Sequence, residues 1–303
     1  MTEKTCIITG ANAGIGKAAA VQIAQEGCRV IMACRNPERG EAALQEVCQA
    51  SGSEAVELMI VEMSLQSSIQ AFAEAFLAKY DVLDVLIHNA ADFDTRRKDI
   101  VLTEEGVEQV WATNHLGPVL LTDLLLPAQK RSEQGRIITI SSKGLIAYPF
   151  LKIDLNDPEF RQTKFSVQKA YYQSKLAQVM YTYWLADTLK DTAVTANVIR
   201  VTNVRIDIDK RYPDAPKLMR KMYAIKSSFA ITPKEMAQTY TYLATSDEVS
   251  ETTGKYYDSP TSIVNSSGYS RDRENIEAVM ALTRRYLPEP APSNLEPRTA
   301  NEA

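Results

Sequence analysis

Tyr171 and Lys175 are the residues whose types and spacing most directly indicate chemistry. They stand four positions apart in Tyr171-Tyr172-Gln173-Ser174-Lys175, and residues with this spacing share one face of a helix. An unperturbed tyrosine has a pKa of about 10, which is too high for efficient proton transfer near neutrality. A nearby ammonium group favours the tyrosinate and lowers that pKa. The pair is therefore a candidate acid/base couple, although this pattern alone occurs by chance in many helices.

A glycine-punctuated turn near the N-terminus is a candidate phosphate-binding site. Residues 9–16 read Thr-Gly-Ala-Asn-Ala-Gly-Ile-Gly and connect an apolar run to a helical stretch. Glycines let the backbone approach a pyrophosphate, and the helix N-terminus supplies N–H donors and positive dipole. The spacing Gly-x-x-x-Gly-x-Gly predicts a dinucleotide site, and the alternative is a tight turn without a ligand. The candidate cofactor contacts are Gly10, Asn12, Ala13, Gly14, Ile15 and Gly16.

The residues after the second predicted strand bear on which dinucleotide would bind. That strand ends at Ala33-Cys34-Arg35 and has no carboxylate to accept from an NAD ribose hydroxyl. A basic side chain at this place accommodates the 2′-phosphate of NADP instead. Arg35 therefore favours NADP(H) over NAD(H). Lys17 either adds to the positive potential that Arg35 creates for the phosphate or is a solvated lysine. Glu62 either accepts a hydrogen bond from the adenine amino group or is a solvated glutamate.

Further polar residues stand at or near the ends of later predicted strands, where ligands of doubly wound sheets bind. Ser141 and Ser142 end the fifth strand, and a serine hydroxyl there can polarise a substrate carbonyl. Asn89 and Ala90 end the fourth strand, where small residues let the backbone approach the inner ribose of a cofactor. Asn114 is polar within an otherwise apolar helix, so it is either a site residue or a core residue satisfied by the backbone.

Strand-like and helix-like segments alternate along the chain and must position these residues. The predicted strands are residues 5–9, 29–33, 55–61, 82–87, 136–140 and 193–199. The predicted helices are residues 14–26, 37–50, 67–80, 104–130 and 167–190. Such alternation predicts an α/β, doubly wound (Rossmann) parallel sheet of about seven strands with helices on both faces. Residues 1–287 would form this single NAD(P)-binding domain, and residues 288–303 a Pro-rich flexible tail.

Composition and charge narrow the class of protein. The 303 residues are 45% hydrophobic and carry a net charge of −4, whereas nucleic-acid-binding surfaces are basic. We therefore expect no nucleic-acid partner. No apolar stretch approaches the ~20 residues that span a bilayer, and no leader of signal-peptide form precedes the first strand. We expect no membrane span.

The cysteines and His88 bear on the compartment and on metal binding. The 4 cysteines are Cys6, Cys28, Cys34 and Cys48. Their spacing matches neither a zinc site nor a redox pair, so we expect buried thiols, a reducing compartment and a cytoplasmic protein. His88 has no obvious acidic partner or second metal ligand in the sequence. We therefore expect a structural histidine and no metal site.

Taken together, the motifs resemble those of the short-chain dehydrogenase/reductase superfamily, over about residues 4–287. Within it, the chain is similar to the retinol-dehydrogenase-like branch, which also contains the light-dependent protochlorophyllide reductases. The strings that carry the resemblance are residues 9–16, 33–35, 86–90, 113–117, 136–142, 171–177 and 254–257. The gap between Ser142 and Tyr171 is longer than in most members, as it is in this branch.

The resemblance implies a catalytic tetrad of Asn114, Ser142, Tyr171 and Lys175. Tyr171 would donate or accept the proton, and Lys175 would lower its pKa while bonding the nicotinamide ribose hydroxyls. Ser142 fills the family's serine position and would hold the substrate oxygen, while Asn114 would fix a water behind Lys175. The resemblance also implies a cofactor contact at Val204. Homodimers and homotetramers are frequent in the family, typically through the two long helices.

Two departures from the family pattern concern the nicotinamide end. Residues 88–91 read His-Asn-Ala-Ala where the family usually has Asn-Asn-Ala-Gly. Val201-Thr202 and Ile206 stand where the family commonly has Pro-Gly and then a threonine that contacts the nicotinamide side. The contacts that would hold the nicotinamide therefore differ from those of the family, and we consider more than one function for this protein.

The first hypothesis is an NADP(H)-dependent oxidoreductase that interconverts a carbonyl and an alcohol. An apolar lid over residues 207–231, opposite Leu145, Tyr148 and Phe150, would suit a hydrophobic small molecule. The resemblance suggests a retinoid or a steroid. The second hypothesis is a catalytically impaired NADP(H)-binding regulatory or scaffold protein with the same fold. A third is light-driven reduction of a tetrapyrrole.

Overall fold

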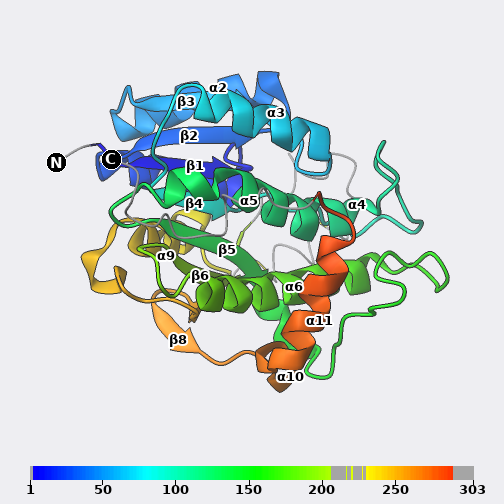
Figure 1. Cartoon of the computed structure of the whole chain (residues 1–303). Helices are drawn as coiled ribbons and strands as arrows, with labels where there is room; N and C mark the ends of the chain where they lie inside the picture. Colours follow the sequence, from blue (N-terminus) through cyan, green and yellow to red (C-terminus); the bar gives the residue numbers. More distant parts are fainter. Residues whose placement is uncertain (1–2, 206–215, 217–219, 221–226, 228–229, 289–303) are drawn as a thin grey trace.

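The centre of the computed structural model is one sheet of eight strands, and the structure describes residues 3–205, 216, 220, 227 and 230–288. The strands are β1 Thr5–Thr9, β2 Arg29–Cys34, β3 Val56–Ile60, β4 Val85–His88, β5 Arg136–Ser142, β6 Thr195–Val201, β7 Tyr256–Asp258 and β8 Ser262–Val264. Their order is β3-β2-β1-β4-β5-β6-β7-β8 (Figure 1), and all neighbours are parallel except β7 with β8. The predicted doubly wound sheet is confirmed. The antiparallel edge strand β8 makes eight strands rather than about seven.

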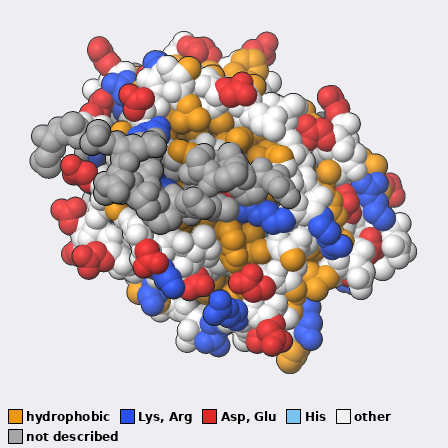
Figure 2. Space-filling view, in the orientation of Figure 1, with side chains coloured by type: hydrophobic (Ala, Val, Ile, Leu, Met, Phe, Trp, Pro, Cys, Tyr) orange, Lys and Arg blue, Asp and Glu red, His pale blue; other side chains and the backbone are white. Residues whose placement is uncertain are grey.

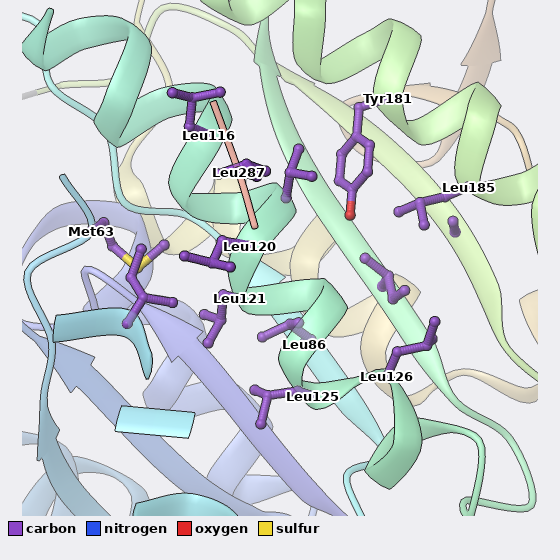
Figure 3. Packing of buried hydrophobic residues seen from close by; sticks show 14 of the residues in the cluster. Met63, Leu86, Leu116, Leu120, Leu121, Leu125, Leu126, Tyr181, Leu185 and Leu287 are labelled. Atoms are coloured by element: carbon purple, nitrogen blue, oxygen red, sulfur yellow. The ribbon is translucent and has the colours of Figure 1, made fainter. Parts of the chain in front are cut away.

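Helices cover both faces of the sheet, because the strands present apolar side chains on both sides. One face carries α1 Gly14–Gln25, α2 Pro37–Ser51 and α9 Pro233–Thr245; the other carries α3 Gln66–Leu77, α5 Gly117–Gln129, α6 Val167–Thr188 and α11 Arg273–Arg284. Within β1, Ile7 packs in the cluster under α5 and α6, whereas Ile8 packs under α1 and α9. Leucines of α5 meet Leu86 of β4 and Tyr181 of α6 in the first cluster (Figure 3).

The segment after β4 differs from the single long helix predicted over residues 104–130. Helix α4 spans Gln109–Trp111, a π-helical turn spans Ala112–Leu116, and α5 follows. Gly106 has a φ of +79°, which a right-handed helix does not contain. The Glu108 carboxylate accepts from the N–H groups of Val110 and Trp111. The helix therefore begins five residues later than predicted, and its π-helical turn carries Asn114.

Three shorter elements complete the described chain: the 3-10 turns Lys143–Ala147 and Asp247–Val249, and helix α10 Gly268–Arg271. Helix α11 packs on α6, and Arg284 at its end pairs with Asp123 of α5. Most of the predicted lid and, after residue 288, the predicted tail lie outside the described residues. Among the residues that the structure describes, no helix has the length and apolar character needed to cross a membrane.

The positions of the cysteines, the charged side chains and the potential metal ligands can be compared with the predictions from the sequence. Cys6, Cys28 and Cys34 are buried free thiols, as predicted, and Cys48 is half-buried. On the face drawn in Figure 2, acidic and basic side chains are interspersed. In the described part of the chain, no group of three or more histidine, cysteine, aspartate or glutamate side chains is placed to hold a metal ion.

Candidate active site

The strand order changes direction between β1 and β4. From β1 the chain builds outward to β2 and β3, then crosses to β4 on the other side of β1. Loops leaving two such strands diverge to opposite faces, and ligands of open α/β sheets bind between them. The glycine turn follows β1, and residues 89–94 follow β4. The predicted cofactor site therefore lies at this switch point.

The glycine turn leads directly into the N-terminus of α1. Within the described chain, no side chain caps this helix and its first turn has no acidic residue. Among the described residues, no atom would lie within 4 Å of an ideal Cβ at Gly14, whose φ is +56°. Of the predicted contacts, Ala13 and Gly14 are exposed, Gly10, Asn12 and Ile15 are half-buried, and Gly16 is buried. Uncapped first-turn N–H groups bind phosphates, so the turn fits the pyrophosphate of a dinucleotide.

Asn89 ties the end of β4 to this turn. Its amide nitrogen donates to the carbonyl oxygens of Thr9 (2.9 Å) and Gly10 (3.2 Å). The next residue, Ala90, donates its backbone N–H to the Thr9 hydroxyl at 3.0 Å. The Tyr240 hydroxyl of α9 donates to the Asn89 amide oxygen at 3.2 Å, which fixes the orientation of that amide. Asn89 and Ala90 thus hold the turn in position.

Gly16→Ala is expected to destabilise the protein by about 1–3 kcal/mol, the usual cost of overpacking. An added Cβ would lie 2.4 Å from the Asn89 amide nitrogen and 2.7 Å from the Gly10 carbonyl oxygen. Chemical denaturation measures the change. The matched control is Gly268→Ala, where no atom of the described part of the chain lies within 4 Å of the added Cβ; we expect a change within about 0.5 kcal/mol. Equal effects of the two substitutions would contradict the tight packing of the turn.

Arg35 stands at the end of β2 with its side chain 68% exposed. One guanidinium nitrogen lies 3.4 Å from a carboxylate oxygen of Glu62. The other carboxylate oxygen of Glu62 accepts from the N–H and the hydroxyl of Ser64. Glu62 is therefore held in place by its own loop and orients Arg35, a pairing that the sequence did not predict. Lys17 forms an ion pair with Glu46 of α2, a contact that the sequence did not predict.

The two serines that end β5 face different surroundings. Ser141 is buried, and its hydroxyl donates to the carbonyl oxygen of Lys175 at 3.0 Å. Ser142 is partly exposed, and its hydroxyl oxygen accepts from the N–H of Gly144 at 3.1 Å. Ser141 thus joins β5 to α6, while the hydroxyl at the surface of the site is that of Ser142.

Tyr171 and Lys175 lie on α6, which begins after the capping side chain of Ser166. The Lys175 ammonium nitrogen donates to the Ile140 carbonyl oxygen at 2.8 Å and lies 5.7 Å from the centre of the Tyr171 ring. Lys175 is only 2% exposed. Its burial lowers the pKa of the ammonium to about 7 because a charged group is poorly solvated there. The half-buried Tyr171 interacts electrostatically with Tyr240, whose pKa burial raises.

Asn114 is buried and bonded to its neighbours on two sides. Its amide oxygen accepts from the N–H of Asp92 at 2.7 Å, and its amide nitrogen donates to the carbonyl oxygen of Asp92 at 3.1 Å. The same nitrogen lies 3.1 Å from the Ser174 hydroxyl. Asn114 therefore connects the loop after β4 to the first turns of α6.

Both histidines are buried outside this constellation. The His88 Nε2 atom hydrogen-bonds the Thr122 hydroxyl at 2.8 Å, and the His115 Nε2 atom hydrogen-bonds the Thr283 hydroxyl at 2.7 Å. Burial lowers the pKa of each to about 3. Both imidazoles are therefore neutral near neutrality, which confirms the structural role expected for His88.

The segment after β6, where the sequence departs from the family pattern, is described as far as Arg205. Val204 forms an isolated parallel bridge with Ile231, and the N–H of Arg205 donates to the Ile231 carbonyl oxygen at 2.9 Å. Val204 also packs against the cluster under α1 and α9. Ile206 lies outside the described residues. The start of this segment is thus bonded to the strand-like residues before α9.

Sequence reasoning named Tyr148 as a residue near the site but missed the aromatic contacts of Tyr171 itself. Phe93 stacks on the Tyr171 ring with 4.0 Å between centroids, and Tyr172 packs on Tyr148 at 4.5 Å. An ideal Cβ at Gly144 would lie 2.4 Å from the Tyr172 hydroxyl, so that ring lies directly against the turn after Ser142. The available signal for Phe93 was its place in the loop after β4, whose first residue bonds the glycine turn.

The doubly wound sheet, the glycine turn at its switch point and the Tyr171–Lys175 pair on α6 define a protein of the dinucleotide-binding α/β class. Residues 4–151 match the sequence profile of the short chain dehydrogenase family. Mouse retinol dehydrogenase 14 is 39% identical over 268 residues, which cover 85% of this chain and 78% of that protein. Human retinol dehydrogenase 13 is 34% identical over 84% of this chain and 76% of its own length.

Solved structures agree with these sequence matches. An uncharacterised protein of Mycobacterium paratuberculosis superposes with a TM-score of 0.71 and 28% identity, covering 93% of this chain and 92% of that one. A protein of Escherichia coli assigned as a short chain dehydrogenase and solved with NADPH has a TM-score of 0.62 at 23% identity, over 86% and 98% of the two chains. The chain belongs to the short-chain dehydrogenase/reductase family of oxidoreductases, in its retinol-dehydrogenase-like branch.

Proposed function

We propose that this protein is an NADP(H)-dependent oxidoreductase that interconverts a carbonyl and an alcohol on a hydrophobic small molecule, with Tyr171 as the general acid/base. The observation that carries the proposal is the position of the Lys175 ammonium, which donates to the carbonyl oxygen of Ile140 in β5 at 2.8 Å and lies 5.7 Å from the centre of the Tyr171 ring. Phe93, from the loop that follows the Asn89 contacts to the glycine turn, stacks on Tyr171. The Tyr171 ring therefore contacts the same loop that bonds the glycine turn.

In this proposal each side chain has a separate task. When bound, the reduced nicotinamide supplies the hydride. The Tyr171 hydroxyl gives a proton to the oxygen of the carbonyl, which the Ser142 hydroxyl holds by a hydrogen bond. An ammonium has three donors, and the Ile140 carbonyl oxygen occupies one of those on Lys175. The positive charge of the ammonium favours the tyrosinate that remains after proton transfer.

The preference for NADP(H) rests on Arg35. Its guanidinium is exposed at the end of β2, and Glu62 holds it there. Arg35→Ala is expected to raise the dissociation constant of NADPH about 10- to 100-fold, because a charge-assisted contact contributes about 1.5–3 kcal/mol. NADH binding should change far less. Fluorescence titration with both cofactors measures this, with the remote Arg131→Ala as control. Equal losses for NADPH and NADH would refute the assignment of Arg35 to the phosphate.

The proposed function is tested by following NADPH oxidation with a panel of apolar aldehydes and ketones, and NADP⁺ reduction with the matching alcohols. We expect turnover with some members of the panel, because the aromatic side chains of Phe93 and Tyr172 pack against Tyr171. Retinal and steroid ketones belong in the panel, since the relatives are retinol dehydrogenases. Tight NADPH binding without turnover of any compound would favour a regulatory or scaffold protein instead.

A further inference from the structure

We propose that Phe93 is a positioning residue for Tyr171, an inference that rests on the proposed function. The two rings are nearly parallel, with an interplanar angle of 19° and 4.0 Å between their centroids. Phe93 comes from the loop after β4 and Tyr171 from α6, so the stack joins two segments 78 positions apart in the chain. A phenol that rotates about its side-chain bonds must leave this stack.

Asn114 fixes both segments that carry the stacked rings. On one side its amide bonds the N–H and the carbonyl oxygen of Asp92, the residue before Phe93. On the other side it donates to the Ser174 hydroxyl at 3.1 Å, and that hydroxyl donates to the Tyr171 carbonyl oxygen at 2.7 Å. One buried amide therefore sets the distance between the backbones of Phe93 and Tyr171.

An ion pair and a second ring restrict the loop further. The Asp92 carboxylate pairs with Arg97 at 2.7 Å, and the two side chains are only 19% and 14% exposed. Tyr172 lies beside Phe93, with 6.5 Å between ring centroids and an angle of 58°. The position of Phe93 is thus restricted by the bonds of the neighbouring Asp92 and by the contact of its ring with Tyr172. One of its faces stacks on the Tyr171 ring.

The consequence for catalysis is geometric. Proton transfer requires the phenol oxygen at hydrogen-bond distance from the substrate oxygen, and small displacements of a catalytic group lower rates strongly. A pair of packed aromatic rings is stabilised beyond the area that it buries, so loss of the Phe93 ring removes an interaction that keeps the Tyr171 ring in one orientation. Without the Phe93 ring, Tyr171 keeps its hydroxyl but spends less time in the orientation that brings the phenol oxygen to the substrate oxygen. The rate of the chemical step falls while cofactor binding is unchanged.

Phe93→Leu and Phe93→Tyr test the proposal together. We expect Phe93→Leu to lower kcat about tenfold with the NADPH dissociation constant unchanged, and Phe93→Tyr, which keeps a ring in the stack, to retain kcat within about threefold. The control is Phe165→Leu, which removes one ring of the Phe160–Phe165 pair (5.8 Å); we expect full activity. An unchanged kcat in Phe93→Leu, or equal losses in the leucine and tyrosine variants, would overturn the proposal.

A second measurement needs no turnover and so separates this inference from the proposed function. With 3-fluorotyrosine placed at position 171, the ¹⁹F NMR spectrum of the otherwise wild-type protein should show one narrow line. In the Phe93→Leu background we expect this line to shift and broaden, because the phenol samples several orientations. An identical line in both backgrounds would overturn the positioning role even if the enzyme is active. A changed line without any turnover would support the role and contradict the proposed function.

Discussion

Tyr171→Phe is expected to lower turnover by about 100- to 10,000-fold while leaving NADPH binding intact. General acid/base catalysis contributes a factor of this size, and phenylalanine lacks the hydroxyl that exchanges the proton. The aromatic ring remains, so the stack with Phe93 and the packing of α6 should be preserved. Steady-state kinetics with the best substrate of the panel, together with an NADPH titration, measures both quantities.

Tyr183→Phe is the matched control for this substitution. Tyr183 lies three turns further along α6, and its hydroxyl hydrogen-bonds the Ser266 hydroxyl at 2.9 Å, away from the site. We expect kcat to stay within about twofold of the wild-type value, because this hydroxyl contributes only a structural hydrogen bond. If Tyr171→Phe retained activity comparable to that of Tyr183→Phe, another group would have to supply the proton.

The parallel core of the fold could be predicted because its signals are local. The β1 run Thr5–Thr9 and its helix Gly14–Gln25 follow from an apolar segment, a glycine turn and a helical stretch. The antiparallel strand β8 Ser262–Val264 could not, since it has three residues, none of them buried. The late start of the helix before Asn114 depends on the positive φ of Gly106 and on the capping carboxylate of Glu108. A periodic apolar pattern in the sequence contains no information about the φ angle of a single glycine.

Within the site, the predictable part was likewise the local one. The i, i+4 spacing of Tyr171 and Lys175 determines that both lie on one helix face. The stack of Phe93 on Tyr171 joins residues far apart in the chain, so no local pattern indicates it. The same holds for the Arg35–Glu62 pair between the ends of β2 and β3. Burial of Lys175, which lowers its pKa, also depends on tertiary packing alone.

Lys175→Met is expected to abolish a pH dependence of stability that the wild-type protein shows above pH 7. Burial lowers the pKa of the folded ammonium to about 7, whereas an unfolded lysine titrates near 10.4. Between these values the unfolded chain binds a proton that the folded chain lacks, so the free energy of unfolding rises with pH. At about 1.4 kcal/mol per pH unit, the full rise approaches about 5 kcal/mol. Below pH 7 the folded protein carries the whole cost of the buried charge.

Denaturation of the cofactor-free protein between about pH 6.5 and 9.5 measures this, with the difference between wild type and Lys175→Met taken at each pH. Lys169→Met, at an exposed position of the same helix, is the control and should give a profile parallel to the wild type. Parallel profiles for Lys175→Met would mean that the buried amine does not titrate in this range. In the proposed mechanism the same charge favours the Tyr171 anion, so the variant should be more stable near pH 7 and much less active. The buried Lys175 ammonium would then lower the free energy of unfolding near pH 7, and the same ammonium would promote catalysis by stabilising the Tyr171 anion.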